Sequence, residues 1–197
     1  MEENKLIETF QREQLNEKLN WHQEPTNWYL KDEQLQIFPD ASTDFWQKTH
    51  YGFQADNGHF LYSIVNGDFV IETHVQCNFK YQYDQAGLMI RVSDQCWVKT
   101  AVEFEPEEAN KLGAVVTNHG FSDWSTQDVE DSFTDYKLRI TRKGSDYKVD
   151  YFNLISNDWL QIRMFHLFDE PVVMAGVYAC SPKDAPFSAS FNYLKIQ

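Results

Sequence analysis

The amino-acid sequence predicts an all-β protein, a sandwich of two antiparallel sheets with jelly-roll topology. Roughly a dozen short segments alternate apolar with polar side chains, which is the pattern of half-buried strands. No helical period is sustained after residue 20, and no linker or internal repeat divides the 197-residue chain. A chain of this length can bury a full core as one domain. We therefore expect a single jelly-roll domain over residues 19–197 and an N-terminal segment, 1–18, whose loose apolar spacing suits a short helix.

The strands follow one another between turn signals. Gly67, for example, supplies a positive φ in a tight turn, and Gly144 lies in a hairpin turn. We expect strands at 19–24, 28–31, 34–38, 49–54, 59–64, 69–81, 86–92, 97–104, 112–119, 136–142, 147–154, 159–165, 172–180 and 187–196. Residues 120–125 are expected to form a compact aromatic loop.

The chain is organised around a hairpin of 86–92 and 97–104. In its second strand, Val98 and Val102 share one side, and Trp97, Lys99 and Glu103 share the other. The first side is expected to face the core. Arg91 of the preceding strand joins the second side, where exposed charges would contribute little to stability. A solvated outer face would give the same alternation, but a tryptophan among charges and small residues favours a shallow binding surface.

Composition excludes several classes of function. The net charge of −13 argues against a nucleic-acid partner, because phosphates require clustered Lys and Arg. No apolar run approaches the length of a membrane span, and no signal peptide is visible at the start. We expect a cytoplasmic protein with neither a nucleic-acid nor a membrane partner. The sequence leaves the oligomeric state open.

Metal, cofactor and nucleophile motifs are also missing. The three cysteines, Cys77, Cys96 and Cys180, form no C-x-x-C pair and are expected to be buried free thiols. The six histidines are scattered and match no zinc pattern, and no nucleophile elbow or phosphate-cradling glycine loop occurs. We expect neither a metal site nor a cofactor.

A set of motifs resembles one known family. They are D44-F-W, Y83-D-Q-A-G-L-M-I-R, W97-V-K-T-A-V-E, V115-V-T-N, S122-D-W-S and G176-V-Y-A-C-S-P, in this order. Together they resemble a family of unknown function with the concanavalin A-like lectin/glucanase jelly roll, typified by the regulation-of-enolase protein and YesU. The resemblance covers nearly all of the chain from about residue 19. It implies two curved sheets, the concave one forming a groove where relatives of this fold hold oligosaccharides.

We expect the ligand-binding groove to combine aromatic faces with planar polar groups, which suit the C–H surfaces and hydroxyls of sugars. The candidate residues are Trp97, Lys99, Glu103, Arg91, Asp84, Gln85, Asp44, Trp46, Asp123, Trp124 and Arg163. Arg163 is expected to share its strand face with Trp159. Asp84 has an alternative role, since an aspartate before a strand often sets a turn.

Three functions remain open at this point. The first is a non-catalytic protein that binds or senses an oligosaccharide or small polar ligand; the second is a protein-interaction or regulatory domain. The third is a glycoside-active enzyme, because Glu103, Glu105 and Glu107 alternate along one strand. Pro106 interrupts that run, and Lys99 is expected to hold Glu103 ionised and therefore a poor proton donor. We expect binding without turnover and no catalytic residue.

Overall fold

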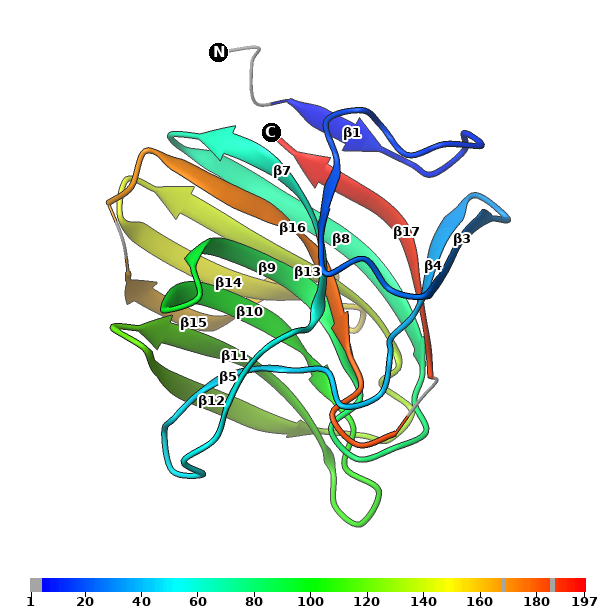
Figure 1. The fold of residues 1–197 in the computed structure, drawn as a ribbon, viewed down its shortest axis with the longest axis vertical. Coiled ribbons are helices and arrows are strands. Elements are labelled where there is room, and N and C mark those ends of the chain that lie inside the picture. The colour runs from blue at the N-terminus through cyan, green and yellow to red at the C-terminus, as the bar shows by residue number, and fades with distance from the viewer. Residues whose placement is uncertain (1–4, 168, 185–186) are drawn as a thin grey trace.

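The structure, a computed structural model, describes residues 5–167, 169–184 and 187–197. Throughout these residues it contains strands, turns and loops and no helix. Two large antiparallel sheets lie face to face (Figure 1). The all-β, concanavalin A-like jelly-roll sandwich predicted from the sequence is confirmed.

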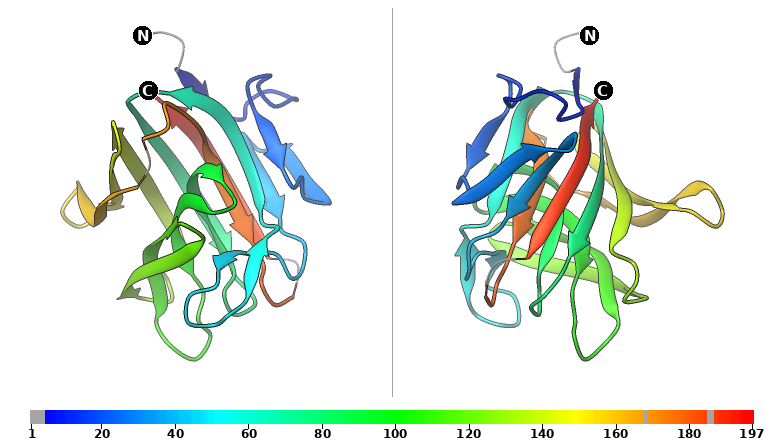
Figure 2. Two further views of the ribbon diagram at one scale, coloured as in Figure 1. Left: turned by 60° about the vertical axis from the view of Figure 1, so that its left-hand side comes forward. Right: turned by 90° about the vertical axis from the view of Figure 1, so that its right-hand side faces the viewer.

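One sheet has eight strands. Seven follow in the order β15-β14-β13-β8-β17-β4-β3, and β1 pairs with the end of β17. Their bounds are β1 Leu6–Glu8, β3 Asn27–Lys31, β4 Gln34–Phe38, β8 Phe69–Asn78, β13 Asp135–Lys143, β14 Asp146–Asn153, β15 Asp158–His166 and β17 Ser188–Ile196. The β14–β15 hairpin extends away from the rest of the sandwich (Figure 2).

The other sheet has seven strands in the order β12-β11-β10-β9-β16-β7-β2. Their bounds are β2 Asn20–His22, β7 His59–Asn66, β9 Gln85–Ser93, β10 Cys96–Glu103, β11 Asn110–Asn118, β12 Phe121–Val129 and β16 Val172–Cys180. A small third pair, β5 (Phe45–Gln47) and β6 (Gln54–Asp56), lies in the stretch between β4 and β7.

The main core fills the space between the two large sheets. Leu88 of β9 and Val98 of β10 are fully buried there and belong to the same apolar cluster as Ile71 and Ile140 of the opposite sheet. The Tyr136 hydroxyl donates a 2.8 Å hydrogen bond to a main-chain carbonyl of β9, which joins the two layers inside this core. The predicted hairpin and its inward face are therefore correct, and its other face points away from the core.

Three local predictions are wrong. The segment expected to form a short helix instead contains β1 and turns, and residues 121–125 lie in β12, after a turn at Gly120, rather than in a loop. Residues 49–53 form a tight turn between β5 and β6, where a strand was expected. In the first case β1 gains main-chain partners on β17, which outweigh the weak helical spacing. In the second, β12 pairs with β11 along its whole length.

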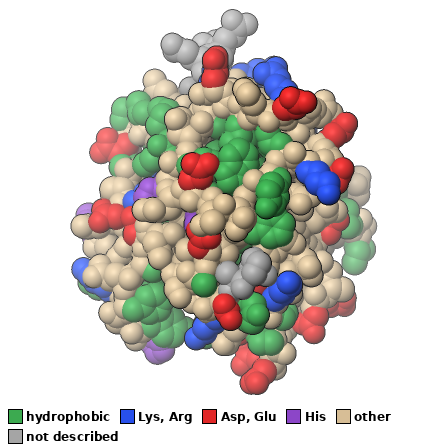
Figure 3. All heavy atoms as spheres, turned by 45° about the vertical axis from the view of Figure 1, so that its right-hand side comes forward, with side chains coloured by type: hydrophobic (Ala, Val, Ile, Leu, Met, Phe, Trp, Pro, Cys, Tyr) green, Lys and Arg blue, Asp and Glu red, His purple; other side chains and the backbone are tan. Residues whose placement is uncertain are grey.

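The cysteine prediction is largely confirmed. All three cysteines are free, and Cys77 and Cys180 are buried, whereas Cys96 is partly exposed. In the described part of the chain, no helix is long and apolar enough to cross a membrane. On the face shown in Figure 3, Lys and Arg side chains are scattered among acidic ones.

Candidate functional site

A stretch of chain crosses the outward face of the seven-stranded sheet, in front of β9–β12 (Figure 1). We call residues 40–58, which include β5 and β6, the covering loop. Phe45 packs its ring against Trp97 and Tyr178, with ring centroids 6.1 and 6.2 Å apart. The main-chain N–H of Gln47 donates a 2.9 Å bond to Ser122 Oγ on β12. Side chains of the loop and of the sheet thus form a second, smaller apolar cluster. It lies on the face that was expected to be an open groove.

Beside this loop lies a cavity of about 280 Å³, which we call the primary pocket. It is bordered by Asp44, Trp46, Tyr51, Phe53, Tyr83, Lys99, Glu103, Val115, Trp124 and Lys183. The covering loop supplies one wall, and β10, β11 and β12 supply another. Five of these residues are aromatic, so the cavity has apolar walls with a few polar groups between them. This combination is typical of small-ligand sites.

Lys99 and Asp44 form an ion pair at the edge of the primary pocket. Lys99 Nζ lies 3.2 Å from Asp44 Oδ1, and the side chains are 4% and 17% exposed. The ammonium also lies 5.9 Å from the ring centre of Trp97 and 5.8 Å from that of Tyr178. The expectation that Lys99 is an exposed groove residue is therefore wrong, because the covering loop buries it and supplies its partner.

Glu103 is partly exposed in the primary pocket. Its Oε2 accepts a 2.9 Å bond from Gln85 Nε2, and Gln85 Oε1 in turn accepts one of 3.0 Å from the buried Tyr178 hydroxyl. Burial raises the pKa of Glu103 to about 8; the Asp44 and Glu105 carboxylates add to the rise, and Lys99 opposes it. The expectation that Lys99 holds Glu103 ionised is therefore wrong. At neutral pH the carboxyl is largely protonated and can donate a hydrogen bond.

Glu105 lies beyond the end of β10, as expected. Its Oε2 accepts a 2.8 Å hydrogen bond from Gln82 Nε2. The series of alternating carboxylates therefore ends at Glu103, where the strand ends.

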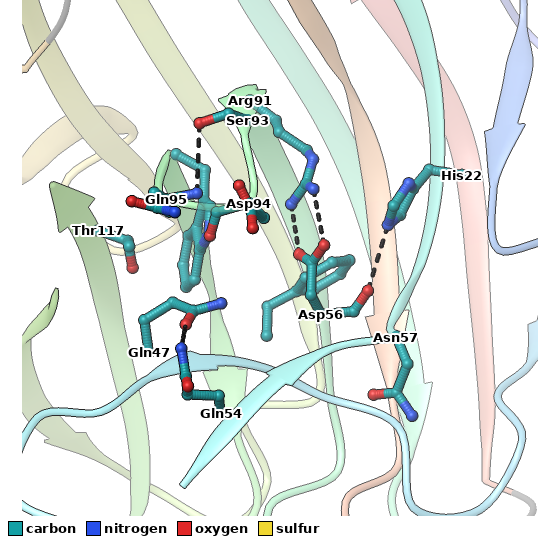
Figure 4. Close-up of polar contacts among 12 residues, drawn as sticks. His22, Gln47, Gln54, Asp56, Asn57, Arg91, Ser93, Asp94, Gln95 and Thr117 are labelled. Carbon is teal, nitrogen blue, oxygen red and sulfur yellow. Dashed lines mark hydrogen bonds and ion pairs between the residues drawn. The ribbon is translucent and has the colours of Figure 1, made fainter. Parts of the chain in front are cut away.

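Two predicted groove residues are covered by the loop instead. Trp97 is completely buried beneath Phe45. Arg91 is 5% exposed and forms a two-pronged ion pair with Asp56, with distances of 2.5 and 2.7 Å. The His22 ring also contacts the main-chain carbonyl of Asp56 (Figure 4). Strand alternation placed both residues on the correct face but did not reveal that another segment covers it.

Asp84 has the structural role that was its alternative. It is fully buried, and its Oδ2 accepts 2.9 Å bonds from the main-chain N–H groups of Lys80 and Tyr81. Its Oδ1 accepts a 2.7 Å bond from Ser181 Oγ. Asp84 therefore closes the turn before β9 and joins it to the end of β16. Gln85, next to it, lies beneath the pocket rather than in it and orients Glu103.

Asp123 and Arg163 meet at the edge of the sandwich. Arg163 Nη2 lies 2.9 Å from Asp123 Oδ1, and Arg163 Nη1 donates a 3.0 Å bond to the Asp123 carbonyl. They border a second cavity rather than the primary pocket. Trp159 does not share this face. Its ring lies against the Arg139 guanidinium, whose Cζ is 4.3 Å from the centre of the Trp159 ring. A bulge in β15 separates the two residues, because Ile162 has no partner on β14 and reverses the alternation.

The structure thus brings together Asp44, Trp46, Lys99, Glu103 and Trp124 of the predicted site. Sequence reasoning missed Tyr51, Phe53, Tyr83, Val115 and Lys183. Three of them are aromatic residues in turns, where no alternation indicates which way a side chain points. Tyr83 has a φ of +72°, a conformation that is rare for a bulky residue and recurs at ligand sites.

No group of three or more His, Cys, Asp or Glu side chains within 5–167, 169–184 and 187–197 is arranged to hold a metal ion.

Comparison with known proteins identifies the family. Residues 21–197 match the model of a family described as "Protein of unknown function (DUF1349)". The chain belongs to this family. A curated relative, "Regulation of enolase protein 1" of Saccharomyces cerevisiae, is 31% identical over 175 residues, which are 87% of this chain and 85% of the relative. The resemblance inferred from the motifs is confirmed.

Solved structures agree with this assignment. A functionally unknown protein from Saccharomyces cerevisiae superposes with a TM-score of 0.85 at 28% identity, over 91% of this chain and 96% of that one. The xylan β-1,4-xylosidase of Bacillus halodurans C-125 superposes with a TM-score of 0.78 at 13% identity. The match covers 97% of this chain but 38% of the xylosidase, so DUF1349 shares a sandwich fold with part of that enzyme.

Proposed function

We propose that this protein binds a short saccharide in the primary pocket without chemically changing it. The observation that carries the proposal is the composition of the pocket. Aromatic rings of the covering loop and of β12 line it together with the polar side chains of Lys99 and Glu103. Trp46 and Trp124, on different elements, are large rings that suit the C–H faces of a sugar. The cavity is at the small end of the range for ligand sites, which favours a ligand of one or two sugar units.

The polar groups can distinguish hydroxyl positions on such a ligand. A protonated Glu103 donates a hydrogen bond and also accepts one, whereas the Asp44 carboxylate, paired with Lys99, only accepts. Gln85 orients the Glu103 carboxyl from below. A site with both kinds of group, each held by a buried neighbour, selects among hydroxyl arrangements rather than binding any apolar molecule.

The family comparison supports the proposal only in part. The xylosidase with the similar sandwich acts on a saccharide by name, which favours a saccharide ligand here, but that likeness concerns the fold. The name of the curated relative instead favours regulation of another protein.

The direct test is binding measured by glycan array and then by calorimetry on any hit. Trp124→Ala should weaken binding at least several-fold, since a stacked ring is lost. Trp159→Ala, a partly exposed tryptophan on the other sheet, is the matched control and should bind normally. Equal affinity of both variants would place the ligand elsewhere. Complete absence of glycan binding would favour the protein-interaction or regulatory function.

A second candidate, a glycoside-active enzyme, is favoured by one observation. Glu103, with its pKa raised to about 8, meets the requirement for a general acid, and Asp44 is a second carboxylate beside the same pocket. Long incubation with any glycan hit and measurement of new reducing ends separates the two functions. We expect none to appear. Release by the wild type that disappears in Glu103→Gln would establish hydrolysis.

A further inference from the structure

We infer that the site recognises the end of a saccharide chain and continues into a second subsite at the β12 edge of the sandwich. The inference rests on the proposed function, because it concerns the same ligand. It follows from two features of the covering loop: the loop closes one side of the primary pocket, and it borders a second cavity on the other side.

The closed side lies toward β9 and β16. Met89 and Trp97 have no exposed surface there, because Phe45 of the covering loop lies over this part of the sheet. The Arg91–Asp56 ion pair holds the loop down at the next position along β9 (Figure 4). A polysaccharide crossing the sheet would have to displace an apolar cluster and separate this ion pair. The groove therefore does not run through, and a terminal sugar unit is what the pocket can admit from this direction.

The other side leads to the second cavity, with a volume of about 730 Å³. Three rings, those of Trp46, Tyr51 and Trp124, border both cavities. Trp46 and Tyr51 lie against each other, with ring centroids 5.5 Å apart. A ligand whose terminal unit occupies the primary pocket can therefore extend along these rings toward the edge of the sheet.

The second cavity has the groups that a further sugar unit would need. Phe121, 57% exposed, offers an aromatic face, and Arg163 presents a planar guanidinium held by Asp123. His166 and Asn118 add further polar groups at its border. Aromatic faces and planar polar groups together suit the apolar faces and hydroxyls of a sugar ring. We assign this cavity as the subsite for the second sugar unit.

The first test compares probes that differ at their ends. Xylotetraose, its reduced alditol and its non-reducing-end methyl ether are measured by calorimetry with the full chain. The inference expects one of the two end modifications to reduce affinity at least tenfold, since one end is enclosed. Equal binding of all three would overturn it while leaving the proposed function intact. Cellotetraose and maltotetraose are measured in the same way. If none of the five saccharides bound, the proposed function and this inference would both be overturned.

The second test separates the subsites by ligand length. Phe121→Ala should lower the affinity for xylobiose by roughly threefold to tenfold, the value of a lost aromatic contact, while leaving that for xylose unchanged. Trp124→Ala should weaken both sugars. Tyr29→Ala, an exposed aromatic on β3 in the other sheet, controls for loss of a surface ring. An unchanged ratio of xylobiose to xylose affinity in Phe121→Ala would exclude the second subsite.

Discussion

At the scale of single residues, the Lys99–Asp44 ion pair connects the covering loop to the sheet. We expect Lys99→Ala to destabilise the fold by roughly 1–4 kcal/mol, because it leaves the Asp44 carboxylate largely buried without its cation. Chemical denaturation measures this loss. The double variant Lys99→Met with Asp44→Asn should recover much of it, since neither charge then remains. A Lys99→Ala variant as stable as the wild type would show that the pair contributes nothing to the fold.

Glu103 should make stability depend on pH. Its pKa in the folded state, about 8, lies above the ordinary value of 4.5, so its contribution to stability is fully present below 4.5 and is lost as the pH rises through 8. In Glu103→Gln the side chain stays neutral at every pH. We expect the variant to match the wild type at pH 5 and to be more stable by roughly 1–3 kcal/mol at pH 9.

The control for this prediction is Glu107→Gln, which removes an exposed carboxylate in the loop after the strand. Its stability relative to the wild type should change far less between pH 5 and 9. A Glu103→Gln variant whose difference from the wild type is the same at both pH values would contradict a raised pKa for this carboxyl.

These residues also show how far sequence alone could reach at this scale. Alternation assigned Val102 to the core and Lys99 and Glu103 to the opposite face, and the structure agrees. Alternation, however, shows only which face of the sheet a side chain points to, and not whether that side chain is buried. Whether an outward side chain meets water or another segment depends on contacts distant in sequence, and here residues 40–58 provide them.

At the scale of elements, the covering loop depends on a close approach at its end. A Cβ added to Gly58 would lie 2.4 Å from the Phe45 ring and 2.5 Å from Cys180 Sγ. We expect Gly58→Ala to cost roughly 1–3 kcal/mol, as overpacking usually does. Measured again in a Phe45→Ala background, the cost should fall, because the ring that the methyl meets is gone. The same cost in both backgrounds would show that the ring contact is not its origin.

The loop also explains which elements could not be predicted. Apart from β12, the long strands of the two sheets have regular alternation and were found with nearly correct bounds, including both strands of the central hairpin. The turn at 49–53 has positive φ at His50 and Gly52, a local conformation that no hydrophobic period indicates. Likewise, the bulge at Ile162 shifts every later side chain of β15 to the other face, and nothing in the sequence marks it.

At the scale of the whole molecule, the fold could be predicted and the site only in part. Strand number, chain length and the order of the motifs were sufficient for a jelly-roll sandwich, because each is a property of the chain as a whole. The primary pocket lies where four separate stretches meet: the covering loop, the turn before β9, strands β10–β12 and the turn before β17. Such a meeting is a property of the tertiary structure. The family match begins at residue 21 and does not cover the residues before it.

The last prediction concerns those residues. Leu6 of β1 and Phe10, just beyond it, are 3% and 2% exposed and belong to the main core, and the Phe10 N–H donates a 2.8 Å bond to Glu8. Residues 6–10 are therefore part of the sandwich. We expect Leu6→Ala to lower the free energy of unfolding by roughly 2–4 kcal/mol, the cost of a cavity in a packed core.

Ile7→Ala is the control, because its side chain is 48% exposed on the same strand and should cost less than about 1 kcal/mol. The primary pocket lies on the far side of the other sheet, so glycan affinity at 25 °C should not change in either variant. If Leu6→Ala were as stable as Ile7→Ala, the packing of β1 against the core would contribute nothing to the stability of the fold.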